Sequence, residues 1–523
     1  MEKFIFGFKK CLNLSYLNAG FTVNENNEFI LYIMDGGIIM TIVEKFEIVA
    51  KYHAKKTALY SDIEGELTYQ KLSENINFIA NQIQSINVTN NPVIAVCIPR
   101  SFAMVSAMLG CLKAGVAYLP LDPSYPLNRI LYMLENSHID TILISEQTDK
   151  LFAAPYHKLK INTVDETIKS EMNLNSKKIT LACIMYTSGS TGTPNGVMLS
   201  NRAVMNTIEW RIQYYRLNEA DIALQIPSYS YASSIEDIFS TLLSGGSLVI
   251  VPQEKLLNMK YLKHLIDFYS ITHFLMVPSL YKEFVKSLSN QNTLRFVTLA
   301  GEPFLSSLSQ LHYKSLPYTA LYNEYGMTET GVGCMAGEIS PDADYITMGK
   351  MISNMSALVL EKDERDIGEL YISGIGLADG YHYDVVSTSE CFIFIENQRY
   401  FKTGDIVQQL KDGDYLFIGR NDNQIKRNGQ RLNLNEIDKL LQTDNVVKNS
   451  KSVAVELYEK KRIICFVQTE KTDNSYFYRL IENNLPSSYK PDYIVTMCEF
   501  IYLPNNKINI NEMKNRFLLT MVN

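Results

Sequence analysis

Several signatures are missing from this sequence of 523 residues. Its eight cysteines form no CxxC pair and its seven histidines form no HExxH motif, so a zinc site is not expected. Lysine and arginine are not clustered, and a formal net charge of −7 argues against a nucleic-acid partner. Scattered cysteines of this kind are typical of the reduced thiols of a cytoplasmic protein.

A membrane-spanning pattern is also missing. The apolar stretch 29–43 is interrupted by Asp35-Gly36-Gly37, which predicts a turn between two short strands. The first residues lack the apolar core of a secretory signal peptide. We therefore expect no membrane partner and a cytoplasmic location, and we treat residues 1–40 as an N-terminal extension of unknown role.

Helical patterns alternate with short apolar runs from about residue 41 onward. Predicted strands cover 93–99, 141–145, 247–252, 273–278 and 295–301, and predicted helices cover 72–84 and 102–113. This alternation predicts an α/β fold of parallel-rich sheets covered by helices. Near residue 420 polar residues crowd together, so we predict a large core domain, 41–420, followed by a small α+β lid domain, 421–523.

The segment 186–197 reads YTSGSTGTPNGV and follows an apolar run, 179–186, that predicts a buried strand. Hydroxyl side chains and glycine N–H groups suit a polyphosphate, although the P-loop pattern GxxxxGK[ST] is absent. We expect this segment to lead from a strand into a helix, 202–215, capped by Asn201. The alternative is a solvated linker rich in serine and glycine.

Seven further segments accompany the string SGSTGxPxG in a fixed order. They are LKAGVAYLPLDPSYPLNRILYML (112–134), SYSYASSIEDIF (228–239), NEYGMTET (323–330), GELYISGIGLADGY (368–381), FKTGDIV (401–407), GRNDNQIKRNGQRLNLNEID (419–438) and LPNNKINI (503–510). Over residues 41–515 the chain resembles the adenylate-forming enzymes, and the segment 112–134 resembles their nonribosomal peptide adenylation domains in particular. We call residues 186–197 the phosphate loop.

The resemblance implies that a carboxylate attacks the α-phosphorus of ATP in the presence of Mg²⁺. The implied ATP-binding residues are Thr187, Ser188, Gly189, Ser190, Thr191, Gly192, Gly301, Glu302, Asn323, Tyr325, Gly326, Asp405, Arg420 and Lys507. Among them, Asp405 would bind the ribose hydroxyls, Tyr325 would stack on adenine and Asn323 would bind its amino group.

Three of the implied residues are catalytic: Lys507, Thr328 and Arg420. Lys507 would bridge the carboxylate and the α-phosphate in the transition state, and Thr328 would contact that phosphate. Glu329 would bind Mg²⁺. Asp422 would be the hinge on which the lid rotates between adenylate and thioester formation.

The implied substrate pocket predicts an unusual acid. Its residues are Tyr231, Ala232, Ser233, Glu236, Leu275, Thr298, Ala300, Glu324, Val332 and Gly333. Relatives that activate α-amino acids carry aspartate where this chain has Ala232, and a buried ammonium without that partner is costly. We therefore expect an acid without an α-ammonium group. Glu236 and Glu324 could bind a distal amine, or Glu236 could point elsewhere.

The phosphate loop departs from the resemblance at Asn195, where lysine is usual, which predicts weaker binding of ATP or pyrophosphate. Sixteen residues follow Lys507, without a Gly-Gly-x-Ser segment for pantetheine attachment. We expect a free-standing enzyme that loads the pantetheine of a separate carrier protein. An acyl- or aryl-CoA ligase is one alternative, and a non-catalytic nucleotide-binding protein is another.

Overall fold

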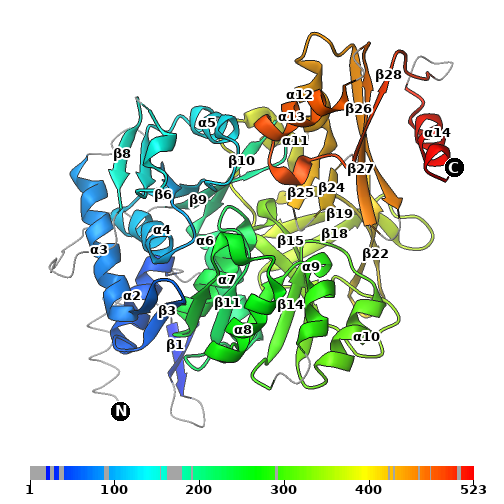
Figure 1. Ribbon diagram of the computed structural model, residues 1–523. Helices are drawn as coiled ribbons and strands as arrows, with labels where there is room; N and C mark the ends of the chain where they lie inside the picture. Colours follow the sequence, from blue (N-terminus) through cyan, green and yellow to red (C-terminus); the bar gives the residue numbers. More distant parts are fainter. Residues whose placement is uncertain are drawn as a thin grey trace.

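The computed structural model describes residues 19–23, 29–33, 40–86, 93–153, 155–161, 180–189, 193–288, 292–421, 424–427, 430–457, 460–470, 473–502 and 508–522. These residues form two large sheets surrounded by helices, followed by smaller sheets toward the C-terminus (Figure 1). The α/β class predicted from the alternating pattern is confirmed. The division into domains at residue 420 stays a prediction.

The first large sheet has seven strands in the order β20-β10-β9-β6-β5-β7-β8. Its strands are β5 (Val93–Cys97), β6 (Ala117–Pro120), β7 (Thr141–Ile144), β8 (His157–Lys160), β9 (Leu181–Thr187), β10 (Asn195–Ser200) and β20 (Gly380–Tyr381). The pairs between β9 and β8 in this order are parallel, whereas β10 is antiparallel to both of its neighbours. The helices α3 (Tyr69–Ser85), α4 (Phe102–Ala114) and α5 (Leu127–Asn136) belong to this part of the chain.

The second large sheet has nine strands in the order β17-β16-β15-β14-β13-β11-β12-β3-β4. Its strands are β3 (Thr57–Ser61), β4 (Gly65–Thr68), β11 (Ile222–Gln225), β12 (Ser247–Ile250), β13 (His273–Met276), β14 (Phe296–Ala300), β15 (Ala320–Met327), β16 (Val332–Glu338) and β17 (Lys350–Met351). The accompanying helices are α2 (Ile42–Tyr52), α6 (Asn201–Tyr214), α7 (Ala232–Leu243), α8 (Met259–Tyr269), α9 (Pro278–Phe284) and α10 (Ser306–Ser315).

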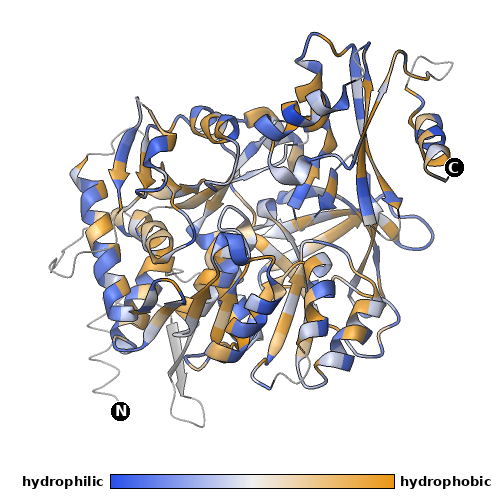
Figure 2. Cartoon of the chain, viewed as in Figure 1, coloured by the Kyte–Doolittle hydropathy of each residue, from blue (hydrophilic) through white to orange (hydrophobic). Residues whose placement is uncertain are grey.

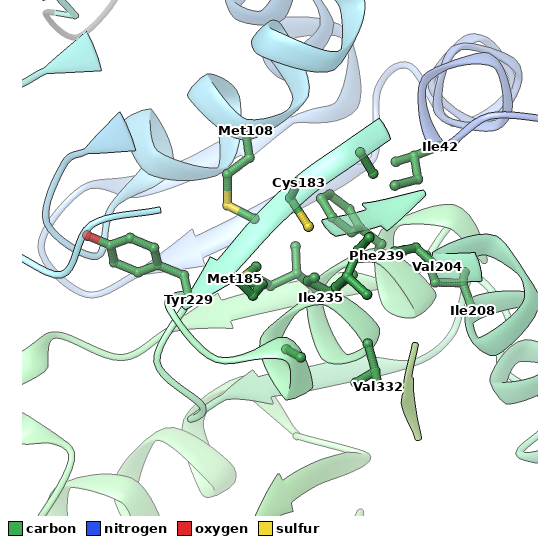
Figure 3. Close-up of a cluster of buried hydrophobic side chains, with 14 of the residues drawn as sticks. Ile42, Met108, Cys183, Met185, Val204, Ile208, Tyr229, Ile235, Phe239 and Val332 are labelled. Atoms are coloured by element: carbon green, nitrogen blue, oxygen red, sulfur yellow. The ribbon is translucent and has the colours of Figure 1, made fainter. Parts of the chain in front are cut away.

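The main hydrophobic core lies between the two large sheets. Met108 of α4 and Cys183 of β9 approach Ile235 and Phe239 of α7 there (Figure 3). Helix α7 is buried along nearly its whole length because it is enclosed by both sheets. Apolar residues follow the strands, while the outward helix faces are hydrophilic (Figure 2). The beginning of α7 is therefore held rigidly at the centre of the molecule.

The C-terminal part begins with a five-stranded sheet of β18 (Met355–Leu360), β19 (Ile367–Gly374), β21 (Phe392–Ile395), β22 (Gln398–Gln409) and β23 (Tyr415–Arg420), with helix α11 (Val385–Cys391). A two-stranded hairpin, β24 (Gln424–Arg427) and β25 (Gln430–Asn433), follows; we call it the lid hairpin. The last elements are α12 (Leu434–Gln442), β26 (Asn449–Leu457), β27 (Lys460–Gln468), α13 (Asn474–Asn484), β28 (Tyr493–Met497) and α14 (Ile510–Val522). They have hydrophobic clusters of their own.

The phosphate loop differs from its prediction. It joins two antiparallel strands, β9 and β10, rather than a strand and a helix, because apolar residues after Gly196 continue the sheet and pair Val197 with Met185. The cap of α6 is also one residue earlier than predicted. The side chain of Ser200 accepts the N–H of Ala203 at 3.2 Å, so Asn201 is the first helical residue instead of the cap.

The N-terminal prediction is partly wrong. Strand β2 (Phe29–Ile33) pairs with β1 (Ala19–Val23), and the turn expected at 35–37 lies outside the described residues. The second predicted strand is replaced by α2, because Thr41 and Glu44 form a reciprocal capping box that starts a helix at Ile42. Within the described ranges, no helix combines the length and apolar character needed to span a bilayer.

Candidate active site

A cavity of about 160 Å³ lies where both large sheets meet the lid hairpin. The expected nucleotide-binding and catalytic residues that border it are Thr187, Ser188, Gly301, Tyr325, Gly326, Thr328 and Glu329. The expected substrate residues that border it are Tyr231, Ala232, Ser233, Glu236, Ala300, Glu324, Val332 and Gly333. Residues from distant segments of the sequence therefore share one cavity.

Other expected residues do not border the cavity. Leu275 on β13 and Thr298 on β14 are buried but do not border it. The Asn323 amide donates to the backbone oxygen of Thr347 at 2.6 Å, and Glu302 accepts the N–H of Ser279 at 3.1 Å. Both side chains have protein partners in this arrangement.

The phosphate loop is covered by the lid hairpin. The Ser188 hydroxyl donates to the backbone oxygen of Arg431 at 2.8 Å, and the Asn433 amide donates to the backbone oxygen of Gly189. A side chain at Gly189 would place its Cβ 1.9 Å from the backbone oxygen of Thr193, so this tight loop requires glycine. Ser190, Thr191 and Gly192 lie outside the described residues.

Asp405 has partners on both of its carboxylate oxygens. The Tyr325 hydroxyl donates to Oδ2 at 2.5 Å, and the Arg420 guanidinium donates to Oδ1. Burial, followed by the charge of Asp405, raises the pKa of Tyr325 well above its ordinary value. The expected ribose-binding carboxylate and the expected adenine-stacking ring are therefore joined to each other, and Lys426 Nζ lies 5.4 Å from the centre of that ring.

Glu329 lies in the short 3₁₀ helix η4 (Thr328–Thr330), directly after Thr328. Its carboxylate accepts the Tyr381 hydroxyl at 3.1 Å, and Arg431 Nη1 lies 3.2 Å from each of its oxygens. No group of three His, Cys, Asp or Glu side chains in the described part of the chain is arranged to hold a metal ion. Mg²⁺ that arrives with phosphates needs only one or two protein carboxylates, so Glu329 fits such an ion.

The beginning of α7 carries no carboxylate toward the cavity. Tyr231 precedes the helix and Ala232 is its first residue, with the Tyr125 hydroxyl 3.3 Å from that of Tyr231. Burial, followed by the neighbouring Tyr125, raises the pKa of Tyr231 well above its ordinary value, and Asp122 adds to this rise. The oxygens of Asp122 accept hydrogen bonds from Ser124 and Ser228.

The cavity residue Glu324 has a buried cationic partner that the sequence did not reveal. Arg211 of α6 is fully buried and forms an ion pair with Glu324 of β15. The Tyr215 hydroxyl donates to the same Glu324 oxygen at 2.5 Å. Glu236 of α7 faces this group, because its Oε2 and that of Glu324 both lie near Gly333.

The residues of the lid hairpin that border the cavity were not predicted from the sequence; they are Lys426, Gln430, Arg431 and Leu432. Their signal was present in the polar stretch 419–433, where Lys426 and Arg431 lie opposite each other in the hairpin register. Lys507 and Asp422 lie outside the described residues. Tyr502 and Ile508, which flank the stretch containing Lys507, do not border the cavity.

Comparison with known proteins identifies the family of the chain. The profile of the AMP-binding enzyme family matches residues 46–382. Bacitracin synthase 3 of Bacillus licheniformis is 34% identical over 483 residues, which cover 90% of this chain and 8% of that protein. Gramicidin S synthase 2 of Brevibacillus brevis is 30% identical over 487 residues, with coverages of 90% and 11%. The chain thus spans a small part of the length of these relatives.

Two solved structures illustrate the shared fold. The adenylation domain AlmE of Vibrio cholerae, in complex with glycyl-adenosine-5'-phosphate, superimposes with a TM-score of 0.77 at 21% identity, covering 93% of this chain and 99% of that chain. A double mutant of the o-succinylbenzoate CoA synthetase of Bacillus subtilis gives a TM-score of 0.80 at 18% identity, with coverages of 90% and 98%.

Proposed function

Because the chain belongs to the AMP-binding enzyme family and is an AMP-forming ligase, we propose that it activates a small carboxylic acid and loads a carrier protein. ATP would supply the adenylyl group, and the phosphopantetheine thiol of the carrier would accept the acyl group. The supporting observation is the single cavity bordered by Thr328 and Ser188 together with Ala232 and Glu236. The similarity of the chain to bacitracin synthase 3 and gramicidin S synthase 2 favours nonribosomal peptide or related natural-product biosynthesis.

The proposed first step joins two oxygen-rich anions. A carboxylate oxygen of the acid attacks the α-phosphorus of ATP, and the bond to pyrophosphate breaks, leaving an acyl-adenylate. The protein contributes by positioning the reactants and neutralising charge. Thr187, Ser188 and Thr328 offer hydroxyl donors beside the reacting phosphate, and Lys507 would bridge both reactants. Mg²⁺, held by Glu329, would reduce the repulsion between the anions.

The proposed second step transfers the acyl group. The carrier thiol attacks the acyl carbonyl carbon, the bond to AMP breaks, and the thiol proton leaves to solvent. We infer that the lid arrangement described above corresponds to this step, because the lid hairpin faces the cavity. A cavity of about 160 Å³ is small beside the roughly 300–1,000 Å³ of ordinary ligand sites. Binding of ATP would therefore require the lid to rotate away, with Asp422 as the proposed hinge.

The proposed acid lacks an α-ammonium group. Ala232 supplies no carboxylate at the start of α7, and the oxygens of Asp122 are held by two serines. An unpaired buried ammonium costs several kcal/mol. Ordinary α-amino acids are therefore expected to be poor substrates.

Pyrophosphate exchange tests the adenylation step. Purified protein is incubated with ATP, labelled pyrophosphate and a panel of standard amino acids and aryl, hydroxy, β-amino and ω-amino acids. Lys507→Ala should abolish exchange with the best acid while ATP binding changes little. Lys439→Ala, an exposed lysine on α12, is the matched control. Exchange that survives Lys507→Ala within a few-fold contradicts the role of Lys507.

The acceptor is tested separately with the best acid. We expect acyl transfer to a holo-carrier protein to be faster than transfer to free CoA. Faster transfer to CoA identifies an acyl-CoA ligase instead. ATP binding without exchange for any acid in the panel contradicts the proposed function and favours a non-catalytic nucleotide-binding protein.

A further inference from the structure

Two buried carboxylates from different elements converge on the cavity. Glu236 on α7 is 2% exposed and Glu324 on β15 is 3% exposed, and both border the cavity beside Gly333. A Cβ at Gly333 would lie 3.0 Å from Glu236 Oε2 and 3.7 Å from Glu324 Oε2. The missing side chain at this position therefore leaves a space that both oxygens face.

These two oxygens lack a well-placed protein donor. Among the described residues, neither Glu236 Oε2 nor Glu324 Oε2 accepts a hydrogen bond of ordinary geometry, although the backbone N–H of Gly333 is close enough to the Glu236 carboxylate to lower its pKa. The other Glu324 oxygen is held by Arg211 and by the Tyr215 hydroxyl. Buried acceptors without donors are destabilising, so native proteins rarely retain them without a reason.

The charges around the pair are also unbalanced. Burial, and then the charge of Glu324, raises the pKa of Glu236 well above its ordinary value, while Arg211 lowers it. Arg211 is already paired with Glu324, so it cannot fully compensate both carboxylates. A ligand with a positive charge and several N–H donors would supply both the counter-charge and the hydrogen bonds that the Glu236 and Glu324 carboxylates lack. An alkylammonium group, with three donors and no acceptor, has that chemistry.

We propose that Glu236 and Glu324 bind a cationic amine at the distal end of the substrate, so that the enzyme activates a β- or ω-amino acid. This inference depends on the proposed adenylation function and specifies its substrate class. The proposed binding positions for the two ends of the acid lie at different points along β15. Glu324 precedes Met327, the last residue of this strand, by three residues, which corresponds to roughly 10 Å of extended chain. The reacting carboxylate is proposed to bind at the Thr328 end, so this spacing favours longer ω-amino acids over β-amino acids within the proposed class.

A basic α-amino acid such as L-lysine is the competing occupant, because it also carries a distal amine. Its α-ammonium would lie beside Ala232, where the cavity wall has no carboxylate. An ω-amino acid without the α-amine avoids this unpaired charge. We therefore expect the ω-amino acid to be activated better than its α-amino counterpart.

The experiment compares matched acids by pyrophosphate exchange. The series contains β-alanine and longer ω-amino acids, their ω-hydroxy and unsubstituted counterparts, L-ornithine and L-lysine. Glu236→Gln should lower kcat/KM for the best ω-amino acid by roughly a hundredfold, the size expected for losing one partner of a buried ion pair. The loss for the unsubstituted acid should be much smaller, so the ratio of the two kcat/KM values measures the contact with the ammonium group. Glu338→Gln, an exposed glutamate at the end of the same strand as Gly333, is the matched control.

A second variant keeps the proposal testable if Glu236→Gln does not fold. Gly333→Ala keeps both carboxylates and places a methyl group 3.0 Å from Glu236 Oε2, so it should block long ω-amino acids more than short unsubstituted acids. A wild-type preference for neutral acids, or an equal loss for every acid in both variants, overturns the proposal. Exchange with neutral acids alone would leave the adenylation function intact, whereas no exchange with any acid contradicts that function itself.

Proton release provides a readout that a structural role would not change. An ammonium at this position favours the ionised form of Glu236, whose pKa is raised by burial and then by the charge of Glu324. The groups that face Glu236 are Glu324, Arg211, Asp237 and Cys334. Calorimetry of ω-amino acid binding in buffers of different ionisation enthalpy should detect a released proton near neutral pH. The same release in Glu236→Gln would assign it to another group and contradict the proposal.

Discussion

Arg431 of the lid hairpin holds Glu329 of the core, with its Nη1 3.2 Å from both carboxylate oxygens. Glu329 is the carboxylate proposed to bind Mg²⁺, so in this arrangement a protein cation lies where the proposed ion would bind. The guanidinium and the ion could not both hold the same oxygens. We therefore expect lid position and nucleotide binding to depend on each other.

Arg431→Ala should lower the KM for MgATP by roughly tenfold, because nucleotide no longer competes with a charged hydrogen bond. Thioester formation should slow, since the lid loses a contact that holds it over the cavity. The two half-reactions can be measured by pyrophosphate exchange and by carrier acylation. Arg427→Ala is the control, because Arg427 lies in the same hairpin but binds Asp492 of the lid. An unchanged KM for MgATP in Arg431→Ala contradicts the competition.

A buried ion pair joins α5 to α12, across the predicted boundary between core and lid. Arg129 lies 2.9 Å from Glu436, whose other oxygen accepts the Tyr489 hydroxyl at 2.7 Å. Arg129→Met should destabilise this lid position by about 3–5 kcal/mol, since Glu436 stays buried without its partner. We expect thioester formation to slow much more than adenylation. Asn128→Ala removes a neighbouring contact, to Asn484, and should have a smaller effect. Equal losses in both half-reactions would indicate general damage to the fold.

The sequence predicted five inner strands of the two large sheets, because they are short, largely apolar runs. β5, β7, β12, β13 and β14 all lie within their predicted ranges. β10 was missed for a local reason. The asparagine and glycine at its start are residues typical of loops. Their strand conformation depends on pairing with β9, which the local sequence does not show.

Side-chain partners across long separations could not be predicted. Arg211 and Glu324 are 113 residues apart, and Arg431 and Glu329 are 102 apart. Periodicity fixes which face of an element is buried, but it does not fix which charged groups meet across two elements. The direction of Glu236 was open for this reason, and the structure turns it toward the cavity.

Asn195 occupies the position in the phosphate loop where lysine is usual, so substituting lysine there tests the effect of the missing cation. It is 8% exposed, and its Oδ1 lies 3.1 Å from the position of a Cβ at Gly189, so its side chain is beside the loop. Asn195→Lys should lower the KM for ATP and the inhibition constant of pyrophosphate by roughly tenfold, if charge-assisted hydrogen bonds form. Asn195→Gln, which lengthens the side chain without charge, is the control. Unchanged constants would mean that position 195 does not reach the phosphates.

The pH dependence of stability should reflect the buried carboxyl groups of α7. Burial raises the pKa of Asp237 from 3.8 to about 7, although Arg211 and Arg100 act in the opposite direction. A raised folded-state pKa means that the folded protein holds a proton that the unfolded chain releases near pH 4. The stabilisation is therefore complete below about pH 4 and is lost as the pH rises through about 7.

Asp237→Asn removes this titration without changing the size of the side chain. Between about pH 5 and pH 8 the wild-type protein should lose on the order of 3 kcal/mol more stability than the variant. Urea unfolding at several pH values measures the difference, with Glu338→Gln as an exposed control. Glu236 retains its own raised pKa in the variant, so some dependence of the same sign should remain. Identical pH profiles for wild type and Asp237→Asn would show that Asp237 is ionised in the folded protein, stabilised by Arg100 and Arg211.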